Sequence, residues 1–221
     1  MSLQISVLPV TAFRQNCRIV SKDDSKEAIV CDPGDNANEI ACMLEDADLK
    51  LAGIILTHAH LDHIGGVAEL SDLTGSPIYG PGADDQILID EITKQSKGLG
   101  LKPCRPFKPR FVADGQILKI GSIPELTVIS TPGHTPGGVC YYCKDEDFVL
   151  TGDTLFKLSM GRTDFPGGDQ RALYISLLRL ANLPDTTRVL PGHGMDSTIG
   201  YERANNPYLA EAYNLLDDNK L

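Results

Sequence analysis

The feature that most constrains this chain is a cluster of three histidines and one aspartate in the segment "THAHLDHIGG" at residues 57–66. The chain has five histidines in all, so most of its imidazole lies in this segment. The apolar run "LAGIILT" leads into the cluster and predicts a buried β-strand. Because side chains two apart on an extended segment face the same side, His58 and His60 can bind one cation.

The next two polar residues of the cluster, Asp62 and His63, lie where the chain should turn into a helix. Asp62 is either the N-cap of that helix or a ligand, and His63 offers a nitrogen with a different direction. Two adjacent cation sites could therefore share this one loop.

The other two histidines, His134 and His193, occur in similar surroundings. Each follows an apolar strand and lies in a turn rich in Gly and Pro, in "STPGHTPGG" and "VLPGHGMDS". A third strand leads to Asp153 in "VLTGDTLF". Imidazole nitrogens and carboxylate oxygens are ligands that zinc, iron and manganese accept, so the sequence predicts a transition-metal site at these strand ends.

The rest of the chain predicts one layered α/β domain over residues 1–221. The opening third contains three short strands, and the later half contains four more, each bounded by turn residues. Residues 83–110 are less regular and could form a lid or an edge elaboration. Helical spacing is found in segments that begin with "NANEI", "HIGGV", "DDQIL", "DQRAL" and "NPYLA". No repeat or Pro-rich linker divides the chain, which favours a single domain.

The charge balance limits the class of partner. The chain has 20 Lys and Arg against 30 Asp and Glu, a formal net charge of −10, and such a surface repels phosphate backbones. No apolar run reaches the roughly 20 residues that a membrane span needs. We therefore expect a cytoplasmic protein that binds neither nucleic acid nor membrane and acts on a small molecule.

The six cysteines are scattered, which favours reduced, buried thiols. Cys140 and Cys143 form a C-x-x-C pair, but "GGVCYYCKD" predicts a strand, where residues three apart face opposite sides. A metal or redox role for this pair is therefore not expected.

Together, the H-x-H-x-D-H segment and its later partners resemble the metallo-β-lactamase superfamily over nearly the whole chain. The resemblance implies an αβ/βα four-layer sandwich, with two mixed sheets, outer helices and metal ions at one edge of the sheets. It also implies a first metal site of His58, His60 and His134, a second site of Asp62, His63 and His193, and Asp153 as the bridge between them.

Within this superfamily, "GDTLF", "MGRTDFPGGD", "LPGHG" and "TIGYERANNPYL" are similar to the glyoxalase II branch, the hydroxyacylglutathione hydrolases, and above all to its short bacterial members. That similarity implies hydrolysis of thioesters such as S-D-lactoylglutathione. Longer members carry an added C-terminal helical domain that helps to bind glutathione, and we expect none here. Arg162 lies where those enzymes place a basic residue, which implies binding of a substrate carboxylate; alternatively, Arg162 pairs with Asp164 or Asp169.

The expected chemistry needs two divalent ions per chain, most simply zinc, with iron or manganese as alternatives. Such ions lower the pKa of a shared water, supply hydroxide at neutral pH, and polarise the thioester carbonyl. Asp153 and Asp62 are the expected catalytic carboxylates, and Asp62 either acts as a ligand alone or also accepts a proton. Asp32 in "CDPG" either orients a ligand histidine or only forms a turn with Pro33.

Other functions remain open from the sequence. "GRTDF" also resembles persulfide dioxygenases, which would bind a single iron through His58, His134 and Asp153. Hydrolysis of another thioester, ester or lactone is a further alternative, as is a non-catalytic binding module. Serine-hydrolase, phosphate-loop and dinucleotide-binding motifs are absent from the sequence. Metal identity, native acyl group and oligomeric state are left undecided.

Overall fold

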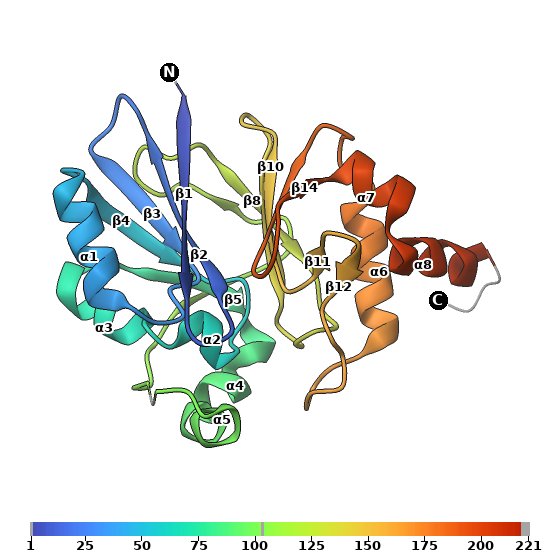
Figure 1. The fold of residues 1–221 in the computed structure, drawn as a ribbon, viewed down its shortest axis with the longest axis horizontal. Coiled ribbons are helices and arrows are strands. Elements are labelled where there is room, and N and C mark those ends of the chain that lie inside the picture. Colours follow the sequence, from blue (N-terminus) through green and yellow to red (C-terminus); the bar gives the residue numbers. More distant parts are fainter. Residues whose placement is uncertain (1, 103, 218–221) are drawn as a thin grey trace.

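The computed structural model describes residues 2–102 and 104–217, in which two six-stranded sheets face each other (Figure 1). The first sheet contains, in spatial order, β1 (Leu3–Val10), β2 (Gln15–Lys22), β3 (Glu27–Cys31), β4 (Lys50–Ile55), β5 (Ile78–Gly82) and β6 (Arg110–Val112). The second sheet contains β14 (Ser197–Thr198), β13 (Arg188–Pro191), β10 (Phe148–Gly152), β9 (Val139–Cys143), β8 (Leu126–Ser130) and β7 (Ile117–Leu118). A small hairpin is formed by β11 (Leu155–Phe156) and β12 (Ser159–Met160).

Both sheets are mixed, as expected. In the first sheet, β1, β2 and β3 are antiparallel, and the pairs from β3 to β6 are parallel. In the second sheet, β10 and β13 are parallel and the other pairs are antiparallel. In each sheet, the parallel strands are joined through helical segments, the usual connection for parallel neighbours.

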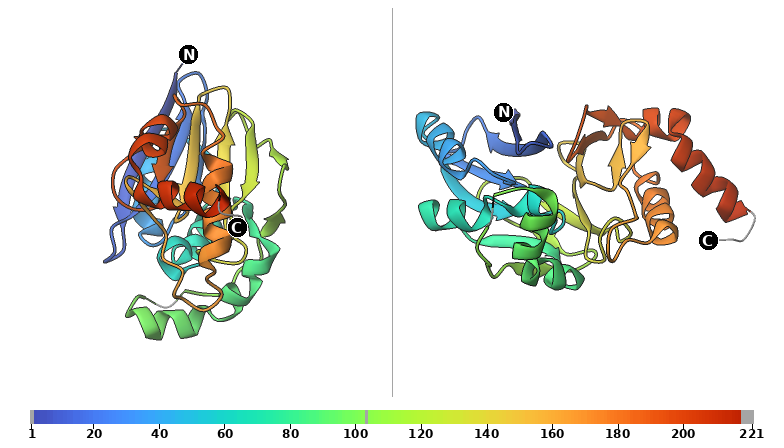
Figure 2. Two further views of the ribbon diagram at one scale, coloured as in Figure 1. Left: turned by 90° about the vertical axis from the view of Figure 1, so that its right-hand side faces the viewer. Right: turned by 60° about the horizontal axis from the view of Figure 1, so that its bottom comes forward.

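Helices cover the outer face of each sheet, and Figure 2 shows them on both sides of the sheet pair. The helical elements of the first half are α1 (Ala37–Asp46), α2 (Leu61–Ile64), α3 (Val67–Thr74), the 3-10 turn η1 (Ala83–Asp85), α4 (Gln86–Asp90) and α5 (Ile92–Leu99). The second half has α6 (Gln170–Leu180), α7 (Ile199–Asn205) and α8 (Pro207–Asp217). This layering confirms the αβ/βα four-layer sandwich.

Three apolar clusters hold the layers together. One fills the space between the sheets and includes Ile29, Ile55, Tyr141 and Phe148, all fully buried. The other two lie between each sheet and its helices. Each fully buried large apolar side chain contributes roughly 1.5–3 kcal/mol, so burial of the inner sheet faces stabilises the frame on which the strand-end loops stand.

Two expected helices differ from the structure. The helix expected to begin at "HIGGV" is divided at Gly65 and Gly66, because these glycines contact the loop after β3: a Cβ on Gly65 would lie 2.3 Å from the carbonyl oxygen of Gly34. Its predicted end is confirmed at Gly75, which adopts φ 68°. The helix expected from "DDQIL" is divided at Glu91, which leaves helical geometry with ψ 13°.

The prediction that Cys140 and Cys143 face opposite sides of one strand is confirmed by β9. Cys140 packs in the cluster beneath α6 and α8, whereas Cys143 packs between the sheets. Their side chains therefore cannot meet at one ion. Among residues 2–102 and 104–217, no helix has the length and apolar character to cross a bilayer.

Candidate metal centre

The predicted ligands come together at one edge of the sheet pair, from loops that follow four strands. His58 and His60 follow β4, His134 follows β8, Asp153 follows β10, and His193 follows β13. The remaining two, Asp62 and His63, lie in the first turn of α2. The N-cap of α2 is His60, so the alternative expectation that Asp62 caps this helix was wrong.

The first donor cluster consists of His58, His60 and His134, whose ligand atoms all lie within 4.8 Å of one another. The Nδ1 of His60 lies 2.9 Å from the Nε2 of His134. On its other side, His134 donates from Nδ1 to the carbonyl oxygen of Arg162 at 2.7 Å. That bond places the proton on Nδ1 and leaves the Nε2 lone pair facing the cluster.

The second donor cluster consists of Asp62, His63 and His193. The Oδ2 of Asp62 lies 3.2 Å from the Nε2 of His193 and 3.9 Å from the Nε2 of His63. Asp153 lies between the two clusters: its Oδ1 is 3.2 Å from His63 Nε2, and its Oδ2 is 3.6 Å from His134 Nε2. A carboxylate in this position can contact a cation in either cluster.

Unpaired buried atoms test whether these residues fit metal ions. His58 Nε2 is buried without a hydrogen-bond partner, and His63 Nε2 and Asp153 Oδ1, also buried, lie 3.2 Å apart but do not form a well-aligned hydrogen bond. Such atoms are costly unless something satisfies them. Ligands bound tetrahedrally at about 2.1 Å from an ion lie roughly 3.4 Å apart, close to the 3.2 Å and 3.6 Å separations around Asp153. The donor set therefore fits a pair of divalent cations.

Asp32 sits behind both clusters. Its carboxylate accepts from the backbone N–H of Thr57 at 2.8 Å, from the Thr57 hydroxyl at 2.6 Å, and from Nδ1 of His63 at 2.9 Å. Because the Thr57 hydroxyl donates to Asp32, its lone pair can accept from Nδ1 of His58, 3.0 Å away. Both histidines then have Nε2 available for a cation, and the Asp32 carboxylate contacts His63, one of the predicted ligands.

Two histidines of the first cluster, His58 and His60, are held neutral. Burial, with the neighbouring imidazoles, keeps the pKa of His58 well below its usual value and lowers the pKa of His60 to about 3. A neutral imidazole has a free lone pair, so these side chains are ready to bind a cation.

The second cluster has the opposite electrostatics. Burial alone would lower the pKa of His63, but Asp153 and Asp62 raise it well above its usual value. For His193, the hydrogen bond to Asp62 and the charge of Asp153 outweigh burial and raise the pKa. Burial raises the pKa of Asp153, yet His63 and its neighbours bring it below its usual value. The carboxylates of the centre are therefore ionised at neutral pH.

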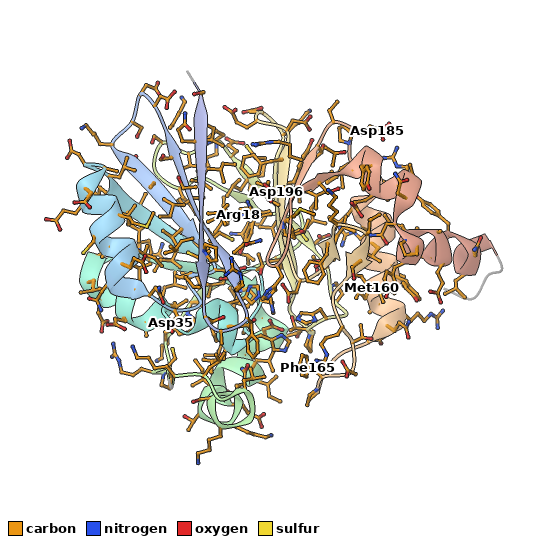
Figure 3. All side chains as sticks on the ribbon, viewed as in Figure 1. Arg18, Asp35, Met160, Phe165, Asp185 and Asp196 are labelled. Atoms are coloured by element: carbon orange, nitrogen blue, oxygen red, sulfur yellow. The ribbon has the colours of Figure 1, made fainter. Side chains whose placement is uncertain are left out.

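The mouth of the centre is partly apolar. Phe165 lies edge-on to His60, with ring centroids 5.3 Å apart, and Figure 3 shows it below the place where the sheets approach. Arg162 stacks on Phe165 at 4.2 Å and pairs with Asp164 through two bonds of 2.6 and 2.5 Å. Asp169 instead caps α6 by accepting from the N–H of Ala172. Of the alternatives for Arg162, the pairing with Asp164 is present.

Sequence reasoning missed residues that hold the ligand loops. Asp85 binds the loops that carry the first cluster, and Asn16 and Arg18 bind the loop that carries His193. The available signal was a charged residue within the apolar strand "NCRIVSK". Asp85 gave no signal, because it lies in the irregular stretch where the lid or edge elaboration was expected.

Comparison with known proteins places the chain in a family. Residues 10–193 match the family model described as the metallo-beta-lactamase superfamily. The chain belongs to that superfamily, and its fold and His/Asp clusters are those of a metal-dependent hydrolase.

Individual members of the superfamily are similar to this chain over nearly its whole length. The chain is 38% identical to the hydroxyacylglutathione hydrolase GloC of Haemophilus influenzae over 210 residues, which cover 94% of this chain and 98% of that protein. Among solved structures, it resembles the B3 metallo-beta-lactamase BLEG-1, with TM-score 0.86, 35% identity and coverage of 93% and 99%. It also resembles TTHA1623 in a di-iron-bound form, with TM-score 0.84, 35% identity and coverage of 92% and 100%.

Proposed function

We propose that this protein hydrolyses thioesters of the S-D-lactoylglutathione type with two divalent cations. The observation that carries the proposal is the convergence of two donor clusters on the two oxygens of one partly buried carboxylate, Asp153. The similarity to GloC supports the thioester substrate. A small molecule also suits a chain with a net charge of −10 better than the polyanionic backbone of nucleic acid does.

The ligands divide between the two cations as the clusters do. We assign His58, His60 and His134 to the first, Asp62, His63 and His193 to the second, and Asp153 to both. When bound, the pair supplies a water of lowered pKa as nucleophile and polarises the substrate carbonyl. Zinc suits this mixture of ligands, and the di-iron form of TTHA1623 supports iron as an alternative.

The chain itself has few other tasks in such a reaction. Burial raises the pKa of Asp62, but His63 and His193 bring it below its usual value, so its Oδ2 is ionised and able to accept a proton from the attacking water. The leaving thiol has a pKa of about 8.5 and departs readily as thiolate. A strong general acid is therefore unnecessary.

Residues at the mouth of the centre would contact the thiol half of the substrate. Phe165 offers an apolar wall beside His60. The guanidinium of Arg162 is paired with exposed Asp164 through Nε and Nη2, so a substrate carboxylate that approaches it also meets the negative charge of Asp164. We therefore propose that glutathione is one acceptable thiol among several.

The test is thiol release measured with a colorimetric thiol reagent, alongside metal content by elemental mass spectrometry. S-D-lactoylglutathione is compared with a lactoyl thioester of a small neutral thiol, and a β-lactam is included because of the similarity to BLEG-1. We expect two ions per chain and thiol release from both thioesters. Two ions with β-lactam opening and no thiol release would replace the proposal.

A second candidate rests on a specific geometry. His58, His134 and Asp153 form a two-histidine, one-carboxylate group, the ligand set of many non-haem iron oxygenases. A persulfide dioxygenase would use this group with one iron. Oxygen uptake with glutathione persulfide, on protein with one iron per chain, would favour it; the complete second cluster favours hydrolysis.

A further inference from the structure

The first donor cluster combines loops from opposite sheets, and one buried side chain joins them. His58 and His60 follow β4 of the first sheet, whereas His134 follows β8 of the second. Between these loops lies Asp85 at the end of η1, with a side chain that is fully buried. Its carboxylate is therefore shielded from solvent between the two loops.

Asp85 contacts both loops through its two oxygens. Its Oδ2 accepts from the backbone N–H of Ala59 at 2.8 Å and from the hydroxyl of Thr135 at 3.0 Å. Its Oδ1 accepts from the backbone N–H of Gly137 at 2.6 Å. Ala59 lies between His58 and His60, which follow β4, and Thr135 directly follows His134. One carboxylate therefore bonds to residues adjacent to all three imidazoles.

All three partners are donors, and an ionised carboxylate is an acceptor only. An amide at this position would turn its N–H₂ group towards at least one backbone N–H. Burial raises the pKa of Asp85 to about 6, and the bonds from Gly137 and Ala59 oppose that rise. At neutral pH the carboxylate is therefore ionised and its three donors are satisfied.

The backbone around Asp85 is built for this close contact. A Cβ on Gly137 would lie 2.5 Å from the backbone nitrogen of Asp85, and 2.6 Å from the carbonyl oxygen of Gly82. Gly82 in turn donates to the carbonyl oxygen of Gly137 at 2.8 Å. The two sheets thus meet beside Asp85 with no room for another side chain.

We propose that Asp85 is a positioning residue that fixes His134 relative to His58 and His60 and so sets the affinity of the first cation site. This inference rests on the proposed metal binding by these histidines. It does not depend on which substrate is hydrolysed.

The main test is Asp85→Asn, with Asp84→Asn as the matched control. Asp84 is the exposed neighbour and loses the same charge. Metal content and affinity for each ion are measured by zinc titration against a chelator, and folding is checked by urea unfolding. We expect Asp85→Asn to bind one of two zinc ions at least about tenfold more weakly, the loss typical of removed ligand support, and Asp84→Asn to match the wild type.

A purely structural role would weaken both ions together, so the weakened ion is assigned to a cluster. Repeating the titration in a His193→Ala protein, where the second cluster is broken, isolates the first. There, Asp85→Asn should weaken the remaining ion by the same factor. Equal weakening of both ions in the parent protein would contradict a positioning role.

A milder variant decides the matter if Asp85→Asn does not fold. Thr135→Val removes one of the three donors, and Thr135→Ser retains it. We expect weaker zinc binding at the first cluster in Thr135→Val and recovery in Thr135→Ser. Unchanged affinities in both Asp85→Asn and Thr135→Val would overturn the inference. Wild-type protein that binds two zinc ions without thiol release would contradict only the proposed function.

Discussion

The two donor clusters lie side by side around Asp153, yet they differ in charge and exposure. The first contains only imidazoles, and His58 and His134 have 2% and 5% of their surface exposed. The second includes the carboxylate of Asp62, and the side chain of His193 is 26% exposed. The first cluster thus has two nearly inaccessible imidazoles, whereas the second contains a carboxylate and is more exposed at His193.

Under the proposed function, this difference separates the binding of a cation by neutral imidazoles from the acceptance of a proton by a carboxylate. Burial and like neighbours keep His58 and His60 neutral, so a cation bound in the first cluster would take compensating charge from Asp153 alone. In the second cluster, Asp62 adds a further negative charge and remains ionised beside the open side. In the proposed reaction, this arrangement would place the proton-accepting carboxylate on the more exposed side of the centre.

The loops of the two clusters are also bonded to the facing sheet in different ways: hydrogen-bond acceptors hold the first, and hydrogen-bond donors hold the second. Asp85 uses acceptors to hold the donors of the first cluster's loops. The His193 loop is held by donors: Asn16 Nδ2 bonds the carbonyl oxygens of Pro191 and Gly194, and Arg18 bonds Pro191 at 3.2 Å. Figure 3 shows Arg18 beside Asp196 in the same loop, where they form an ion pair.

The largest effect is expected from a substitution of Asp153, the residue that the two clusters share. Asp153→Ala should lower thiol release by more than the roughly 10–100-fold that loss of a ligand's hydrogen-bond partner costs, because it deletes a contact to both cations. Metal content and kcat/KM are measured together. Asp145→Asn, an exposed turn residue at the far end of β10, should behave as the wild type. Full activity in Asp153→Ala would contradict a shared ligand.

The next largest effect is expected at Asp32, where a substitution should lower the metal affinity of both clusters. Asp32→Asn leaves at least one donor without an acceptor, because its N–H₂ group must face either the backbone N–H of Thr57 or the pair formed by the Thr57 hydroxyl and His63 Nδ1. The resulting shift of Thr57 and His63 loosens the orientation of the Nε2 atoms of His58 and His63. We expect both ions to bind about 10–100-fold more weakly in a chelator titration. Asp46→Asn, exposed at the end of α1, is the control. Loss of one ion alone would show that Asp32 serves a single cluster.

The sequence predicted which residues converge at the sheet edge, and which strands carry them, for clear physical reasons. A buried strand appears as a short apolar run, and a side chain just beyond it must lie at the sheet edge, as His134 and His193 do. The four-layer sandwich came from the family resemblance of the same motifs, and the family match confirms it.

What the sequence could not supply depends on contacts between distant segments. The division between α2 and α3 arises from backbone contact of Gly65 with Gly34, which no local pattern contains. Asp85 is one of several acidic residues in its stretch, and only its partners Ala59 and Gly137, 26 and 52 residues away, distinguish it. Long-range hydrogen bonds of this kind leave no periodic signal.

A smaller effect should fall on the second cluster alone. Asn16→Ala removes two hydrogen bonds to the His193 loop, each worth about 1 kcal/mol, so urea unfolding should show a loss of roughly 2 kcal/mol. The affinity of the second ion should fall while the first is unchanged. Asn205→Ala removes an exposed bond within α7 and serves as the control. Weakening of the first ion instead would remove the distinction between the two sets of loop contacts.

The smallest expected effect is a pH dependence from Asp85. Its pKa is raised from 3.8 to about 6 in the folded chain, so between these values the folded state binds more protons than the unfolded state. Stability from this group is therefore highest at low pH and declines as pH rises through about 6.

With metal removed by chelation, the free energy of unfolding is measured at pH 5 and pH 7 for the wild type and Asp85→Asn. The difference, wild type minus variant, should fall by about 1 kcal/mol between these pH values, because only the wild type carries the titrating carboxylate. Subtracting the variant cancels the other ionisable groups. A constant difference would mean that Asp85 titrates as an ordinary carboxyl, and the ionised carboxylate would then cost nothing to bury between the two sheets.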